Sequence, residues 1–420
     1  MRGLWRDYRS FSPTARLLMV NQLTINIAFY LLMPYLAGHL SGDLKLAGWA
    51  VGLILGVRNL SQQGMFALGG ALADRYGSRN LIIAGCGLRV VAFTLLGLAG
   101  DLPGLITGSV LTGLAGAMFN PAVRSYLARE AGKRRVEAFA TFNVFYQAGI
   151  LLGPPLGLAL TGVDFRTAAL AASGLFAALT VAQLRRLPPQ SAESNARPPS
   201  MAAGWRAALG NRTFLGFAAA MTGSYILSFQ IYLMLPLLVT GHGGGQAAVT
   251  AMFIASGAAG LAGQVRITAW CRTVLTPAQA LLAGVTLMPV AFLPPAAAES
   301  FTGSVSPGYA QALAVASAVT SALLLTVATA IAYPFEMNTI TCLARDRLVA
   351  THYGVYSTIT GLGITVGTLG AGALSDAARV SGHPALPWLG LTVLGLASAA
   401  GLAVLTRTPA WAARTLAAAT

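Results

Sequence analysis

The sequence has few charged residues, and acids are the scarcest of them. Of its 420 residues, 9% are charged, with 12 Asp or Glu against 27 Lys or Arg. A soluble globule of this length needs more polar surface, so this composition excludes an ordinary soluble domain. Three cysteines and four histidines lack the spacing of a disulfide framework or a metal site. We therefore expect no metal and no other cofactor.

Long apolar runs are present instead. A helix needs about 20 apolar residues to cross the hydrocarbon layer, and runs of that length recur along the whole chain. We predict an all-α membrane protein with twelve transmembrane helices. The predicted spans are 17–38, 48–69, 81–99, 104–126, 138–160, 167–184, 213–239, 247–269, 278–296, 309–342, 353–374 and 387–406.

The basic residues are unevenly distributed between the two sides of these spans. Most lie at the N-terminus or in loops that share its side, whereas only Lys45, Arg166 and Arg379 lie in loops of the opposite side. The positive-inside rule then places both termini in the cytoplasm and the chain in the cytoplasmic (inner) membrane. The same distribution explains the formal charge of +15 without nucleic acid, so we expect no nucleic-acid partner.

One polar stretch divides the chain. It follows the sixth span at Arg185-Arg186-Leu187-Pro188-Pro189 and ends near Met201, before a short segment predicted as an interfacial helix, 205–211. We predict a six-helix bundle over 1–186, a central cytoplasmic loop over 187–211 and a second bundle over 212–420. A weak internal echo, Leu127-Ala128-Arg129-Glu130 against Leu343-Ala344-Arg345-Asp346, supports two pseudo-symmetric bundles that rock about a shared cavity.

A compact charged turn, Gly69-Gly70-Ala71-Leu72-Ala73-Asp74-Arg75-Tyr76-Gly77-Ser78-Arg79, separates the second and third spans. It resembles the loop 2–3 motif of the major facilitator superfamily, with Ser78 where that family usually has a cation. The resemblance implies that Asp74 faces the start of helix 11, near residues 352–354, and that neighbouring charges close the cytoplasmic side. The implied gate residues are Gly70, Asp74, Arg75, Gly77, Arg79, Arg129 and Glu130.

The fifth span carries a glycine and proline motif. Gly149, Gly153, Pro154 and Gly157 resemble the G-x-x-x-G-P-x-x-G pattern of the exporting, proton-antiporting branches of the superfamily. Glycines four apart also let a neighbouring helix approach closely, so packing alone is the alternative explanation. The run from Leu55 to Asp74 resembles the MdtH-like multidrug efflux branch, of drug:proton antiporter type.

Glu336 is the only acid placed well inside a span, two residues after Pro334. A buried carboxyl can bind and release protons near neutral pH, so Glu336 is the first candidate for proton coupling, with Asp74 as the second. The alternative is that Glu336 pairs with an arginine such as Arg58. The first span lacks the acid common in antiporters of the superfamily, and Ser109 stands near the position of the usual helix-4 arginine.

Helical spacing also predicts a substrate cavity with apolar and aromatic walls and a few amides, which suits amphipathic drug-like molecules. Each member is also explained by packing alone. The candidate cavity residues are Gln22, Asn26, Tyr30, Arg58, Asn59, Gln62, Asn143, Gln147, Tyr225, Phe229 and Tyr232.

Together these features predict a proton-coupled exporter of drugs or natural products that works by alternating access as a monomer in the lipid bilayer and confers antibiotic resistance. The alternative on the same fold is a facilitator or importer of an anionic metabolite bound by Arg58 and Arg89. We expect no enzyme, because the spans hold no Ser–His pair, paired aspartates or phosphate loop.

Overall fold

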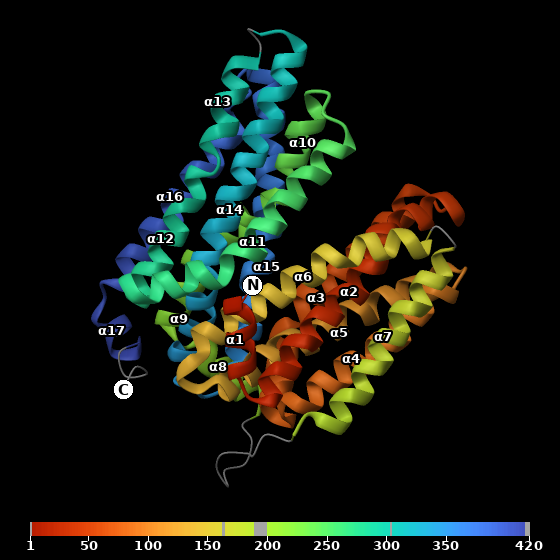
Figure 1. Ribbon diagram of the computed structural model, residues 1–420, viewed down its shortest axis with the longest axis vertical. Helices are drawn as coiled ribbons and strands as arrows, with labels where there is room; N and C mark the ends of the chain where they lie inside the picture. The colour runs from red at the N-terminus through yellow and green to blue at the C-terminus, as the bar shows by residue number, and fades with distance from the viewer. Residues whose placement is uncertain (1, 162–163, 189–199, 303–304, 416–420) are drawn as a thin grey trace. The chain divides into compact units, whose positions relative to one another are not determined.

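The computed structural model describes residues 2–161, 164–188, 200–302 and 305–415, and within these ranges its regular structure is entirely helical (Figure 1). The chain divides into two compact units. The N-terminal unit comprises Arg2–Asn211 together with Ala344–Thr358, and the C-terminal unit comprises Arg212–Leu343 and Ile359–Thr420. Residues 189–199 of the predicted loop lie outside the described residues.

Within the described residues, the N-terminal unit contains six long α-helices and two short ones, besides the first turns of α15. They are α1 (Arg2–Ser10), α2 (Pro13–Gly38), α3 (Gly48–Tyr76), α4 (Ser78–Leu98), α5 (Leu102–Ala131), α6 (Arg135–Thr161), α7 (Phe165–Arg186) and α8 (Met201–Leu209).

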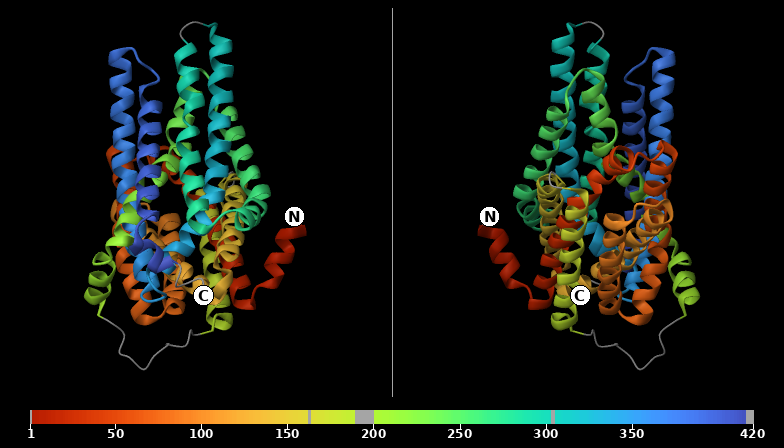
Figure 2. Two further views of the ribbon diagram at one scale, coloured as in Figure 1. Left: turned by 90° about the vertical axis from the view of Figure 1, so that its left-hand side faces the viewer. Right: turned by 90° about the vertical axis from the view of Figure 1, so that its right-hand side faces the viewer.

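The C-terminal unit has helices that run side by side for much of their length (Figure 2). They are α9 (Arg212–Phe229), α10 (Met234–Gly241), α11 (Gln246–Val274), α12 (Pro277–Val290), α13 (Leu293–Thr302), α14 (Pro307–Leu343), α16 (Leu386–Thr406) and α17 (Pro409–Thr415). Helix α15 (Val349–Ser381) begins among the residues of the N-terminal unit and continues into the C-terminal unit.

The number of apolar helices agrees with the prediction. Ten stretches are long and apolar enough to cross a membrane, and one of them, Leu102–Leu160, holds both α5 and α6. Helix α3 is not among the ten because it carries Arg58 and several amides. With α3 added, the described residues contain a helix for each of the twelve predicted spans.

Polar caps and prolines explain where several helices begin and break. Ser12 accepts the N–H of Ala15 at the start of α2, and Thr276 forms a capping box with Gln279 at the start of α12. The predicted span 278–296 is divided into α12 and α13. Pro294 and Pro295 lie in the first turn of α13 and explain this break, since proline lacks an N–H and fits best in a first helical turn.

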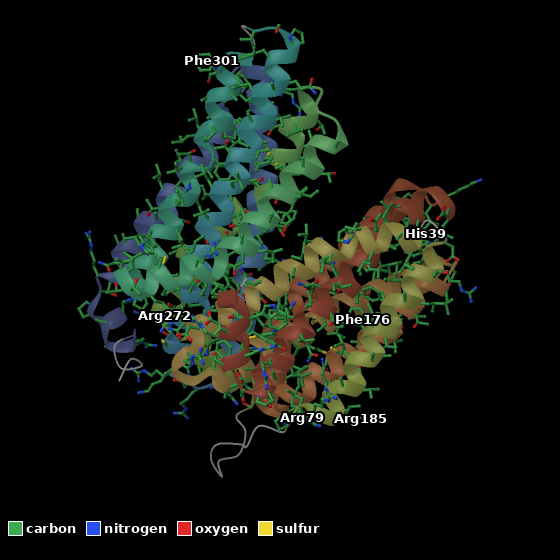
Figure 3. The ribbon with its side chains drawn as sticks, viewed as in Figure 1. His39, Arg79, Phe176, Arg185, Arg272 and Phe301 are labelled. Carbon is green, nitrogen blue, oxygen red and sulfur yellow. The ribbon has the colours of Figure 1, made fainter. Side chains whose placement is uncertain are left out.

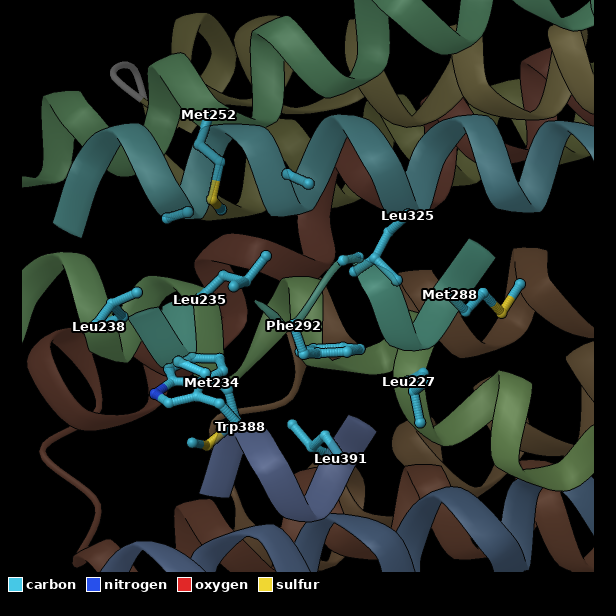
Figure 4. Packing of buried hydrophobic residues seen from close by; sticks show 14 of the residues in the cluster. Leu227, Met234, Leu235, Leu238, Met252, Met288, Phe292, Leu325, Trp388 and Leu391 are labelled. Carbon is cyan, nitrogen blue, oxygen red and sulfur yellow. The ribbon is translucent and has the colours of Figure 1, made fainter. Parts of the chain in front are cut away.

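Each unit has its own apolar core. In the C-terminal unit, Leu227, Leu235, Phe292 and Trp388 belong to one buried cluster contributed by several helices (Figure 4). In the N-terminal unit, Phe93 of α4 and Phe176 of α7 meet edge to face with ring centroids 4.9 Å apart.

Candidate functional site

The end of α3 meets the start of α15 within the N-terminal unit. The backbone N–H of Thr351 donates to Oδ2 of Asp74 at 2.6 Å, and that of Ala350 donates to Oδ1 at 3.2 Å. These N–H groups belong to the first turn of α15, where no intrahelical partner exists and the helix dipole favours an anion. Asp74 thereby caps α15 from a distant part of the chain, and we name this arrangement the α3–α15 contact.

Charge and burial act in opposite directions on Asp74. Its side chain is 4% exposed, and Nη2 of Arg129 lies 3.8 Å from Oδ1. Asp74 lies beyond the end of the predicted span at residue 69. Burial raises the pKa of its carboxyl, while the hydrogen bonds from Thr351, the charge of Arg129 and the N–H of Ala350 lower it. Burial is the largest of these effects, so the pKa of the Asp74 carboxyl lies above its ordinary value.

Glycines allow the two helices to approach closely. A Cβ added to Gly70 would meet the carbonyl oxygen of Ala350, and one added to Gly354 would meet that of Phe66, both closer than the 3.0 Å limit of real Cβ contacts. The side chain of Thr358 extends the contact, because its Oγ1 accepts the N–H of Ala67 and donates to the carbonyl of Gln63. A larger residue at Gly70 or Gly354 would separate the helices.

The other predicted gate residues have different partners. Arg79 donates to the carbonyl oxygens of Leu187 at 2.5 Å and Leu184 at 3.1 Å, at the end of α7. Glu130 accepts the hydroxyl of Ser12 at 2.5 Å. Figure 3 shows Arg79 and Arg185 at one end of the N-terminal unit and His39 at the other.

Two more predicted gate residues flank the turn between α3 and α4. The guanidinium of Arg75 lies 5.5 Å from the ring centroid of Tyr76. Gly77 has a φ of 89°, a left-handed value that favours glycine. These two residues therefore shape the turn itself.

Several contacts of this region carry no signal in the sequence. Arg124 donates to Ser357 at 3.3 Å, Arg135 pairs with Asp346, and the indole N–H of Trp205 on α8 donates to the carbonyl of Ala67 at 3.1 Å. The partners are far apart along the chain. The sequence signal that could have indicated a close helix contact is the group of small residues Gly354, Ser357 and Thr358 at the start of α15.

The motif of the fifth span packs against α2. Added Cβ atoms at Gly149 and Gly157 would meet the carbonyl oxygens of Leu23 and Leu31, and one at Gly153 would lie 2.6 Å from Cβ of Tyr30.

A polar contact accompanies these glycines. The hydroxyl of Tyr35 donates to the carbonyl of Pro154 at 2.6 Å. The glycine face of α6 is therefore a tight helix–helix surface in the N-terminal unit.

Two predicted cavity residues contribute to the same surface. Gln22 donates to Asn26 at 3.2 Å, and Asn26 donates to the carbonyl of Tyr146 at 2.8 Å. Both are buried, as is Asn143, whereas Asn59, Phe229 and Tyr232 are exposed and Tyr30, Gln62 and Gln147 are partly buried.

The arginines of α3 and α4 share an aromatic surface. The guanidinium carbons of Arg58 and Arg89 lie 5.6 Å and 5.8 Å from the ring centroid of Phe29. Arg58 also bonds to Asn59, while Arg89 is enclosed by Phe29, Phe119 and Phe176.

Glu336 lies in the C-terminal unit, on α14. It is 4% exposed, and the hydroxyl of Tyr225 on α9 donates to its Oε1 at 2.7 Å. Burying a carboxyl group in a membrane helix costs free energy, and such groups commonly belong to ion or substrate pathways.

The chain resembles known transporters over nearly its whole length. The Major Facilitator Superfamily model matches residues 18–368. An uncharacterized MFS-type transporter of Mycobacterium tuberculosis is 50% identical over 397 residues, covering 94% of each chain. Multidrug resistance protein MdtH of Aeromonas hydrophila is 30% identical, covering 90% of this chain and 92% of its own.

Solved structures share the fold. The fucose:proton symporter FucP of E. coli aligns with a TM-score of 0.73 at 13% identity, over 94% of this chain and 98% of its own. The human organic anion transporter MFSD10 aligns with a TM-score of 0.72 at 16% identity, over 93% of this chain and 100% of its own. The chain thus belongs to the Major Facilitator Superfamily, whose members are multi-pass membrane transporters of small molecules and not enzymes.

Proposed function

We propose that this transporter exports small amphipathic compounds in exchange for protons, by alternating access, with both termini in the cytoplasm and the chain in the cytoplasmic membrane. The observation that carries the proposal is the buried pair of Glu336 and Tyr225. A carboxyl group buried in a membrane helix can bind and release a proton near neutral pH, and the hydroxyl of Tyr225 holds this one in a fixed position. The relatives named multidrug resistance proteins support the export direction.

The α3–α15 contact supports the alternating-access part of the proposal. Asp74 joins two helices through hydrogen bonds to a helix end, so the contact can break and reform without unfolding either helix. A potential of about 100 mV contributes roughly 2.3 kcal/mol per charge moved. This is enough for a concentration ratio of about 50-fold for each charge that is transported.

The test is proton-gradient-driven uptake of a fluorescent amphipathic dye and a quinolone into inverted membrane vesicles, with Glu336→Gln compared to wild type at equal expression. Glu299→Gln is the matched control, since Glu299 is another partly buried acid of the same unit, 3.8 Å from His242. We expect uptake that an uncoupler abolishes in wild type and in the control, and no uptake in Glu336→Gln. Undiminished uptake in Glu336→Gln would rule out Glu336 as the coupling site.

A second candidate is a facilitator or importer of an anionic metabolite. The observation in its favour is that Arg58 and Arg89 face the same ring, that of Phe29, without a carboxylate partner among the described residues. Gradient-independent uptake of a radiolabelled organic anion, with no dye transport, would favour this candidate over the exporter.

A further inference from the structure

A groove of about 520 Å³ lies in the N-terminal unit, and none of its lining residues belongs to the α3–α15 contact. It is bounded by α1, the first two turns of α2 and the last turn of α7. Its lining includes Tyr8, Thr14, Arg16, Leu17, Val20 and Arg186. Among the described residues that line it there are two arginines and no carboxylate.

Helix α1 forms one wall, and its attachment is well defined. The ring of Tyr8 stacks on that of Phe145, with centroids 5.2 Å apart, and Arg134 donates to the hydroxyl of Ser10 at 2.9 Å. Figure 2 shows α1, in red at the N-terminus, projecting from the side of its bundle. Trp5 is 57% exposed beside Arg9. An exposed Trp with basic neighbours is typical of a helix in the lipid headgroup region.

The two arginines of the groove are not engaged by other side chains among the described residues. Within the described residues, neither Arg16 nor Arg186 has an ion pair or a hydrogen-bonded side-chain partner. Arg186 lies in the last turn of α7, where a cation often bonds the terminal carbonyl groups. Here Arg79 already bonds the carbonyls of Leu184 and Leu187, so Arg186 is left to face the groove.

The groove combines these charges with an apolar floor. Leu17 and Val20 follow Arg16 along α2, and Val20 is 38% exposed on the helix surface. The start of α2 adds the positive end of its dipole beside Thr14. A phosphodiester with an attached acyl chain fits both parts of the groove. The arginines can bind the phosphate in a bidentate manner, and the acyl chain can cover the apolar side chains.

We propose that this groove binds the phosphate headgroup of an anionic glycerophospholipid, with one acyl chain along Leu17 and Val20. The lipid fixes α1 against the bundle at the membrane surface. The recognised chemistry is a phosphate ester, and the source is the membrane rather than free phosphate. Neutral zwitterionic lipid lacks the net charge that two arginines favour.

The experiment uses the full-length protein in detergent and counts bound lipid by native mass spectrometry during titration with phosphatidylglycerol or phosphatidylcholine. Arg16→Gln/Arg186→Gln is compared with Arg185→Gln/Arg407→Gln, which removes the same charge outside the groove. We expect about a 30-fold weaker affinity for phosphatidylglycerol in the groove variant only, since each arginine near an anionic surface changes binding roughly fivefold. Arg16→Lys/Arg186→Lys keeps the charge but loses the bidentate geometry, so it should regain only part of the affinity for phosphatidylglycerol.

Three results would overturn the proposal. The first is an equal loss in the two glutamine variants, which indicates a general charge effect. The second is equal affinity of wild type for the two lipids. The third is displacement of phosphatidylglycerol by millimolar inorganic phosphate, which assigns the groove to a soluble anion. Size-exclusion profiles identical to wild type establish that each variant is folded.

Discussion

The carboxylate of Asp74 on α3 caps the first turn of α15 by accepting the backbone N–H of Thr351 at 2.6 Å. Asp74 and Thr351 are 277 positions apart in the sequence. The contact is polar and lies among glycines, so it combines directional bonds with close helix packing. A contact of this kind can hold two helices together and still open without unfolding them, because each helix keeps its own backbone hydrogen bonds.

We predict that Asp74→Asn weakens the α3–α15 contact. Hydrogen bonds to a charged group contribute about 1.5–3 kcal/mol each, so the population with α15 detached should rise at least about tenfold. The measurement is the labelling rate of Ala71→Cys by a soluble maleimide, since Ala71 is 3% exposed beside Asp74. The native cysteines Cys86, Cys271 and Cys342 are buried and give a low background.

Asp101→Asn is the control for this experiment, because Asp101 caps its own helix through the N–H of Gly104. In the Asp101→Asn background, Ala71→Cys should be labelled at the same rate as in the protein that carries Ala71→Cys alone. An unchanged rate in Asp74→Asn would mean that the carboxylate does not hold α15.

We predict that Gly70→Ala separates α3 from α15. The added Cβ would lie within 3.0 Å of the carbonyl oxygen of Ala350, and a backbone atom cannot move aside as a side-chain end can. Gly64→Ala on the same helix is the matched control, since nothing lies within 4 Å of its Cβ position. Both changes raise helix propensity by about 0.5–1 kcal/mol, so only the contact differs.

Dye transport in vesicles and maleimide labelling of Ala71→Cys measure the effect. Gly70→Ala should lose most transport and label faster, whereas Gly64→Ala should behave as wild type. Equal transport by the two variants would show that close approach at Gly70 is not required.

Apolar run length was enough to predict the helices but not their ends. The predicted span 387–406 nearly coincides with α16, Leu386–Thr406, because its apolar run ends where the helix does. Helix α15 begins at Val349, four residues before the predicted 353. Hydropathy identifies the residues that lie inside the membrane, but a helix can extend beyond them. Helix α15 does so at Thr351 and His352, which precede the apolar run. The break at Gln230–Tyr232 in the predicted span 213–239 was likewise missed.

The candidate site was predictable only in part. The motif resemblance directed attention to Asp74 and residues 352–354, but the groups that bond the carboxylate are the N–H groups of Ala350 and Thr351. Backbone donors carry no side-chain signal in a sequence. The partners of Arg79 were missed for a similar reason, because they are the carbonyl groups at the end of α7.

We predict that Gly157→Ala destabilises the N-terminal unit. Its Cβ would meet the carbonyl of Leu31 on α2 within 3.0 Å, and overpacking of this kind costs about 1–3 kcal/mol. Gly174→Ala on α7 is the control, as its Cβ position is open. Thermal unfolding of the purified variants in one detergent should show a lower midpoint for Gly157→Ala alone. An unchanged midpoint together with lost transport would mean that the motif acts in the transport cycle and not in packing.

The buried arginine of α4 separates the two functional hypotheses. Arg89 is 5% exposed, and its Nε and Nη1 have no hydrogen-bond partner among the described residues. Three phenylalanine rings surround it, and a desolvated cation–π interaction contributes about 2 kcal/mol, so these contacts offset part of the cost of burying the charge. An unpaired buried charge costs several kcal/mol, so we predict that Arg89→Met, of similar length, leaves the thermal midpoint unchanged or raises it.

Transport by the same variant gives the second readout. An exporter of neutral or cationic amphipathic compounds should keep its dye transport within about twofold of wild type, because Arg89 is enclosed by Phe29, Phe119 and Phe176 and does not need to meet the substrate. A carrier of an anionic metabolite should lose uptake at least about tenfold, since a charged hydrogen bond to the substrate contributes at least about 1.5 kcal/mol. Loss of labelled anion uptake with an intact thermal midpoint would therefore favour the facilitator, and retained dye transport would favour the exporter.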